Sequence, residues 1–147
     1  MTERKWEHVL TIEEIEAFVA EVFPRGAAFA GIETLGEGRL ELALRMGDDP
    51  SRFLRPGGTL SGPTLMTLAD TAMYFLVLSL VGKEALAVTT DLTMHFLRRP
   101  PATPLRATAT MLKLGQRLAV GDVHLHSEGV SGPVAHAVVT YALPPAS

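Results

Sequence analysis

Residues 61–82 form the stretch that most constrains the fold, because they are apolar on nearly every face of a helix. Ser61 is a good N-cap, since its hydroxyl can accept a hydrogen bond from an amide of the first turn. Pro63 is tolerated there, because the N–H that it lacks has no partner in a first turn. Gly82 suits the left-handed position that commonly closes a helix. The stretch therefore predicts one long helix that is buried on most of its faces.

Asp70 is the one charged residue in this predicted helix. A carboxylate in apolar surroundings costs several kcal/mol unless it has a hydrogen-bond partner. Asp70 is therefore expected either to contact a neighbouring backbone group or hydroxyl, or to be a functional acid. The helix is also just long enough to cross a membrane, at about 18–20 residues. Its carboxylate and hydroxyls, and the strand-like segments on both sides that need a cover, favour a buried core helix.

The composition narrows the class of protein. A chain of 147 residues is expected to form one domain with its own core. The net charge of −3 gives no general attraction to nucleic acid or to an anionic membrane, so neither is expected as a partner. Cysteine is absent, which excludes a disulfide framework and a thiolate nucleophile. No export signal is visible, and we expect a cytoplasmic protein.

The segments around the helix are short and end at turn formers. Thr11 and Glu14 form a capping box that begins a short amphipathic helix, within an N-terminal extension covering 1–25. The strand candidates are 27–35, 39–46, 85–97, 105–114, 117–127 and 133–143. Short turns join the last three, which predicts antiparallel neighbours. A long apolar helix needs a curved sheet around it. The layout therefore predicts an α+β hotdog fold as a single domain over 1–147, with its main strands in 85–143.

The sequence resembles the hotdog-fold acyl-CoA thioesterases, in particular the phenylacetic-acid-degradation (PaaI-like) group. The matching segments are Ser61-Gly62-Pro63, the helix residues 68–72 and the strand residues 88–97. In that family a glycine at the helix start is followed eight positions later by an acid, and Gly62 and Asp70 have this spacing. The resemblance implies that the Gly62 amide polarises the thioester carbonyl. It also implies that Asp70 is the catalytic carboxylate, as a nucleophile or as the base for a water.

Further site residues follow from the same resemblance. Thr89 matches a hydroxyl that helps to place the water, and Thr90 is adjacent to it. Arg55 stands by spacing where the family often has a polar amide, and could bind an acid group or a phosphate. The phosphates of coenzyme A also predict basic contacts, for which Arg98 and Arg99 adjoin the matched strand. Coenzyme A is here part of the substrate, and no separate cofactor is expected.

The start of the helix departs from the family pattern. Ser61 replaces the usual histidine and Pro63 replaces a second glycine, which leaves Ser61 as a candidate substrate contact. Tyr74 lies one turn beyond the acid and either lines the acyl pocket or packs in the core. Apolar residues near the site favour an aryl or medium-chain acyl group.

Gly62 and Asp70 cannot act on one carbonyl from the same chain. Eight residues of helix separate them by about 12 Å. A hydrogen-bond donor must lie ~3 Å from the carbonyl oxygen, and the attacking group ~3–3.5 Å from its carbon. A two-fold dimer would place Gly62 of one copy near Asp70 of the other. We therefore expect a homodimer, or a tetramer made of two dimers as the family resemblance implies.

Three alternatives remain open at this point. The unusual start of the helix keeps a non-catalytic acyl-CoA sensor open, although the presence of Asp70 argues against it. A dehydratase or hydratase needs a histidine paired with a carboxylate near the helix, which His95 would have to supply. His124, His126 and His136 could form a three-imidazole metal site. No carboxylate obviously completes that site, and histidines on strands commonly face solvent, so no metal is expected.

Overall fold

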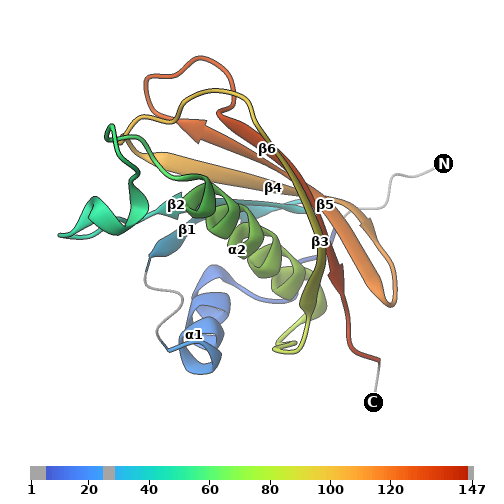
Figure 1. Ribbon diagram of the computed structural model, residues 1–147. Helices are drawn as coiled ribbons and strands as arrows, with labels where there is room; N and C mark the ends of the chain where they lie inside the picture. The colour runs from blue at the N-terminus through green and yellow to red at the C-terminus, as the bar shows by residue number, and fades with distance from the viewer. Residues whose placement is uncertain (1–5, 25–28, 146–147) are drawn as a thin grey trace.

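One long helix, α2 (Gly62–Val81), lies across a six-stranded antiparallel sheet (Figure 1). The computed structural model describes residues 6–24 and 29–145. The strand order is β1-β2-β4-β5-β6-β3. This is the predicted hotdog arrangement of a helix wrapped by a curved sheet. The other elements are α1 (Ile12–Val22), the 3-10 helix η1 (Pro50–Phe53), β1 (Ala30–Gly36), β2 (Arg39–Leu44), β3 (Val88–Phe96), β4 (Leu105–Leu114), β5 (Leu118–Ser127) and β6 (Ala135–Ala142).

The ends of α2 confirm the sequence prediction. The Ser61 hydroxyl accepts a hydrogen bond from the Thr64 N–H at 3.2 Å. At the other end the Gly82 N–H donates to the Leu78 carbonyl, and Gly82 has a φ of +104°, which favours glycine. The helix has the length and hydropathy of a membrane span, but 72% of its most apolar 18-residue window is buried. It contacts five strands and forms the centre of the core.

Hydrogen bonds of His8 and Val9 fasten the segment before α1 to the rest of the fold. Thr11 and Glu14 form the predicted capping box, with reciprocal hydrogen bonds of 3.0 and 3.2 Å, and begin α1. Ahead of the helix, Nε2 of His8 accepts from the Gly38 N–H at 2.9 Å, and Nδ1 lies 2.9 Å from the Ser79 hydroxyl. The histidine thereby joins the β1–β2 turn to α2.

The strand boundaries differ slightly from those predicted. β3 begins at Val88 rather than residue 85, because a turn after α2 is closed by the Ala87 N–H donating to the Glu84 carbonyl. The loop over 47–58 contains η1, which the buried Phe53 anchors to the core. The predicted strand 27–35 begins outside the described residues, and its described part is β1.

β3 forms one edge of the sheet in the described part of the chain. It pairs with β6 on one side, and its other side has no strand neighbour. Val88 and Phe96, at the two ends of β3, are 56% and 53% exposed. A strand edge with unpaired backbone groups and exposed apolar side chains is a surface that can pair with another strand.

Candidate active site

Asp70 lies in the middle of α2 and is held by two hydroxyl donors. The Thr89 hydroxyl donates to Asp70 Oδ1 at 2.6 Å, and the Tyr141 hydroxyl donates to the same oxygen at 2.8 Å. Tyr141 also reaches the Asp70 backbone carbonyl at 3.1 Å. Both donors contact Oδ1, and no described residue donates to Oδ2. One carboxylate oxygen is thus fixed, and the other is left for water or substrate.

A β-bulge explains why Thr89, rather than Thr90, contacts the acid. In the β3–β6 ladder Thr89 lies opposite Tyr141, and the next pair is Asp91 with Thr140. Thr90 is therefore the extra residue, and its hydroxyl donates to the Thr140 carbonyl at 3.3 Å instead. Bulges of this kind commonly redirect a side chain near a site. The cross-strand pair of Thr89 and Tyr141 then faces α2 together.

Tyr141 is the site residue that sequence reasoning missed. Its side chain is only 3% exposed. Burial raises the pKa of the Tyr141 phenol far above its usual value, and the nearby negative charge of Asp70 raises it further. The hydroxyl therefore stays protonated and remains a hydrogen-bond donor. Along β6 the inward positions are otherwise alanine and valine, so the tyrosine was a visible signal, but its partner Asp70 lies 71 residues away.

An apolar cavity of about 260 Å³ opens beside Asp70. Tyr74 lines it and also packs, since its ring stacks on Tyr141 with centroids 5.9 Å apart and meets Phe23 edge-on at 5.8 Å. The Tyr74 hydroxyl donates to the Ala85 carbonyl at 3.4 Å. The sequence left open whether Tyr74 lines a pocket or packs in the core, and the structure shows that it does both. The N-terminal helix adds Val19 to the lining, a contribution that the sequence did not reveal.

Gly62 lies at a second, separate cavity of about 590 Å³ at the start of α2. In the first turn the Thr64 N–H is capped by Ser61, and Pro63 has no N–H. The Gly62 N–H is thus left without a partner among the described residues. A helix N-terminus also carries partial positive charge. This end of α2 can therefore stabilise a negative oxygen.

Three arginines surround the cavity at Gly62. Arg55, Arg98 and Arg99 all line it, which is the grouping expected of residues that bind phosphate. Arg98 is braced by a hydrogen bond of 2.6 Å from Nη1 to the Pro133 carbonyl. The backbone N–H of Arg55 donates to the Thr59 carbonyl at 2.8 Å, and this hydrogen bond closes the turn that carries Arg55. The structure brings these cations together from two loops.

Ser61 has a local role at the helix start. The Thr64 hydroxyl donates to the Phe53 carbonyl at 3.0 Å, so the Ser61 hydroxyl is the donor in its 2.8 Å contact with Thr64. Ser61 lines a third cavity, which contains neither Gly62 nor Asp70. Its hydroxyl thus serves as the helix cap, and the structure gives it no part in either of the other two cavities.

Between Gly62 and Asp70, α2 presents an exposed stripe. Pro63, Met66 and Thr67 are at least partly exposed, whereas the C-terminal half of the helix is buried almost throughout. Met66 is 42% exposed, which is unusual for a large apolar side chain in an otherwise buried helix. Gly62 and Asp70 therefore lie at separate cavities at the two ends of an open helix face.

Comparisons with known proteins identify the family of this chain. The sequence model of the Thioesterase superfamily matches residues 57–133, which include α2, β3, β4 and β5. A candidate thioesterase from Silicibacter sp. TM1040 is 43% identical and has a TM-score of 0.86, with 95% of this chain and 96% of that chain covered. A search of curated proteins finds no match.

More distant structures share the fold. The zebra fish thioesterase superfamily member 2 is 19% identical, with a TM-score of 0.76 over 92% of this chain and 99% of that one. A point mutant of the phenylacetic acid degradation protein PaaI from Thermus thermophilus is 23% identical, with a TM-score of 0.66 over 87% and 99%. The match of the family model over more than half of the chain, and the 43% identity, are decisive. This chain belongs to the Thioesterase superfamily and is a hotdog-fold thioester hydrolase.

Proposed function

We propose that the protein hydrolyses aryl- or medium-chain acyl-CoA thioesters at a site formed by two copies of the chain. Asp70 of one copy supplies the carboxylate, and Gly62 of the other supplies the amide that binds the carbonyl oxygen. The observation that carries the proposal is the Asp70 carboxylate, which is fixed through Oδ1 and lines an apolar cavity. Its free oxygen suits the chemistry that a thioester hydrolase performs.

The reaction follows from the two oxygens of Asp70. Thr89 and Tyr141 hold Oδ1, and Oδ2 has no donor among the described residues, so it is available as the base for a water. The water attacks the thioester carbon, and negative charge develops on the carbonyl oxygen. The partner's Gly62 N–H stabilises this oxyanion, by about 3–4 kcal/mol for one well-placed donor. Collapse of the intermediate breaks the carbon–sulfur bond and releases the free acid, and the leaving thiolate of coenzyme A takes back the proton that Asp70 removed from the water. Direct attack by Oδ2 through an anhydride is the second route open to the same geometry.

The free edge of β3 supports a two-copy site. Antiparallel pairing of β3 with a second β3 would satisfy its unpaired backbone groups and cover exposed apolar residues such as Val88 and Phe96. Because α2 packs on β3, a two-fold axis at this edge would also relate the two α2 helices. The two helices would then lie side by side and point in opposite directions. The first turn of one helix can then lie near the middle of the other, which is the relation that Gly62 and Asp70 need.

The cavities support the choice of substrate. Arg55, Arg98 and Arg99 lie beside Gly62, where the phosphates of coenzyme A would follow the thioester. The apolar cavity beside Asp70 measures about 260 Å³, which is slightly smaller than ordinary ligand pockets of about 300–1,000 Å³. That size favours an aryl or medium-chain acyl group over a long chain. We expect a cytoplasmic enzyme that needs no separate cofactor.

The structure lends the hydratase alternative no support. Such an enzyme needs a histidine beside its carboxylate. No histidine of the described chain lines the cavity at Asp70, and His95 is an exposed residue of β3. The residues that contact the carboxylate are hydroxyl donors, which suit the positioning of a base for water.

Thiol release from a panel of acyl-CoA esters tests the proposal. The panel contains phenylacetyl, benzoyl, short-chain and medium-chain esters, assayed with the wild type and with Asp70→Asn. Asp48, an exposed carboxylate in the loop between β2 and η1, offers a matched control, Asp48→Asn. We expect turnover to collapse only in Asp70→Asn, with folding and oligomer size unchanged. Saturable binding without turnover of any ester would instead indicate a sensor, and turnover that survives Asp70→Asn would place the site elsewhere.

A further inference from the structure

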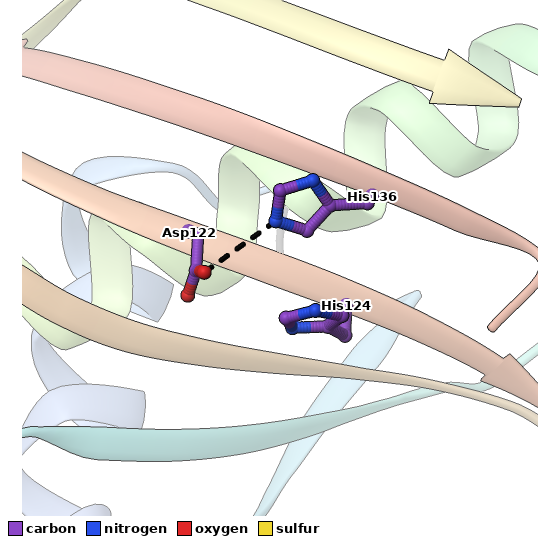
Figure 2. Close-up of side chains that lie close together, drawn as sticks. All are labelled: Asp122, His124 and His136. Atoms are coloured by element: carbon purple, nitrogen blue, oxygen red, sulfur yellow. Dashed lines mark hydrogen bonds and ion pairs between the residues drawn. The ribbon is translucent and has the colours of Figure 1, made fainter. Parts of the chain in front are cut away.

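We propose that Asp122, His124 and His136 form a binding site for a divalent transition-metal ion of the zinc class. The three side chains cluster on β5 and β6, as Figure 2 shows. Their alternation with buried residues places them on the face of the sheet that is turned away from α2. The cluster is therefore distinct from the Asp70 site, and the inference does not depend on the proposed function.

The strand register holds the three ligands together. His124 and His136 are direct partners in the β5–β6 ladder, and their ring centroids are 4.5 Å apart. Asp122 is two residues before His124 on the same face of β5, which places it diagonally across from His136. The backbone ladder thus brings two imidazoles and one carboxylate to one spot.

The distances suit a small four-coordinate ion. Nε2 of His136 lies 3.4 Å from Oδ2 of Asp122. Bonds of about 2.0–2.1 Å to a tetrahedral zinc ion place neighbouring ligand atoms about 3.3 Å apart. One ligand atom from each of the three residues lies within 4.8 Å of the others. Small side-chain rotations would bring the remaining pairs to the same spacing.

The chemistry of the ligands selects the class of metal. Two imidazole nitrogens and one carboxylate oxygen are typical of zinc and other first-row transition ions. Calcium and magnesium prefer sites made of oxygen atoms alone. His136 and Asp122 keep 31% and 22% of their side-chain surface exposed. Solvent can therefore deliver the ion and provide the fourth ligand as water.

The structure changes the set of residues that the sequence suggested. His126 was grouped with the other two histidines because it shares their face, but its ring is exposed and lies 6.4 Å from the His124 ring. The group instead includes Asp122, the carboxylate whose apparent absence argued against a metal. A simple ion pair would involve Asp122 and His136 alone. The third ligand, His124, makes the arrangement a candidate metal site.

A metal here would fasten β5 to β6. The ion would lie on the outer face of β6, whereas Tyr141 faces inward from the same strand. Its expected effect is therefore on stability rather than on the chemistry at Asp70. An ion that binds only the folded chain raises its stability by mass action. For a chain of this size, a hundredfold excess over Kd should raise Tm by about 5–10 °C.

Zinc titration of the untagged 147-residue chain tests the assignment. After treatment with EDTA, the chain is titrated with Zn²⁺ by calorimetry, and Tm is measured with and without Zn²⁺. We expect one ion per chain, and roughly tenfold or greater loss of affinity in each of Asp122→Asn, His124→Gln and His136→Gln. The matched control is His126→Gln, which alters a histidine on the same face and should leave binding unchanged. Co²⁺ absorption spectra should show the same dependence on the three ligands.

Three results would overturn the inference. The first is the absence of saturable Zn²⁺ binding by the wild type. The second is binding that persists unchanged in His136→Gln or Asp122→Asn. The third is an equal loss of affinity in His126→Gln, which would mean that the surface histidines act without the geometry described here.

Discussion

Mixing two inactive variants tests whether each site takes residues from two chains. Gly62→Pro removes the unpartnered amide at the start of α2, and proline is well tolerated at a first helical position. Asp70→Asn removes the carboxylate. In a dimer of either variant, both sites lack the same group. In a mixed dimer, one site lacks both groups and the other has both intact.

The expected recovery follows from this arithmetic. Random pairing of equal amounts makes half of the dimers mixed, and each mixed dimer has one working site of two. The mixture should therefore reach roughly one quarter of wild-type activity. Loss of one oxyanion donor lowers kcat by about 10²–10³-fold. Gly62→Pro alone should thus leave roughly 1% or less, so the recovery stands far above the background.

The assay is thiol release after the two variants are unfolded and refolded together, with oligomer size checked by gel filtration. Gly62→Ala is the control for steric effects, since it keeps the N–H and its added carbon would lie 3.7 Å from the Phe96 ring, an ordinary contact. We expect Gly62→Ala to retain much more activity than Gly62→Pro. A mixture no more active than its better parent would refute the two-chain site.

The other predictions concern Tyr141, the arginines and His8. Tyr141→Phe keeps the ring stacked on Tyr74 but removes a hydrogen bond to a carboxylate, so kcat should fall by about tenfold or more with KM little changed; an unchanged kcat would contradict a positioning role. Arg98→Ala and Arg99→Ala should raise KM for acyl-CoA but not for acyl-cysteamine thioesters, which lack phosphates. Burial lowers the pKa of His8, whose Nε2 accepts from a backbone N–H. The neutral His8 imidazole stabilises the fold fully above about pH 6.5, the pKa of histidine in the unfolded chain. This stabilisation is lost as the pH falls through the lower pKa of His8 in the folded state. Between pH 7.5 and pH 5, the Tm of the wild type should therefore fall more steeply than the Tm of His8→Gln.

Local chemistry explains why the helix could be predicted so closely. Ser61 and Gly82 mark the ends of α2 because capping depends on neighbouring residues alone. The turn after residue 114 likewise set the end of β4. The family resemblance gave Thr89 only as a hydroxyl that helps to place the water. Its hydrogen bond to Asp70 was not predicted, because the residues are 19 positions apart and on different elements.

Long-range register explains what the sequence did not reveal. Thr89 faces Asp70 beside Tyr141 because a bulge at Thr90 sets the β3–β6 ladder, and no local sequence pattern indicates that bulge. Asp122 reaches His136 because β5 and β6 pair in one register out of several that a hairpin could adopt. In both cases each residue was visible in the sequence, and only the partner was hidden.

If the two-copy site proposed above is right, the free edge of β3 should make activity and solubility depend on the protein concentration. A lone chain exposes a strand that can associate with any extended segment, including misfolded neighbours. Pairing with a second copy satisfies the same backbone groups, and on the proposed arrangement it also completes the active site. Below the dissociation constant of the pair, activity per chain should fall on dilution while the exposed edge becomes commoner. On that proposal, the affinity of one β3 edge for another sets the lowest concentration at which the enzyme is fully active.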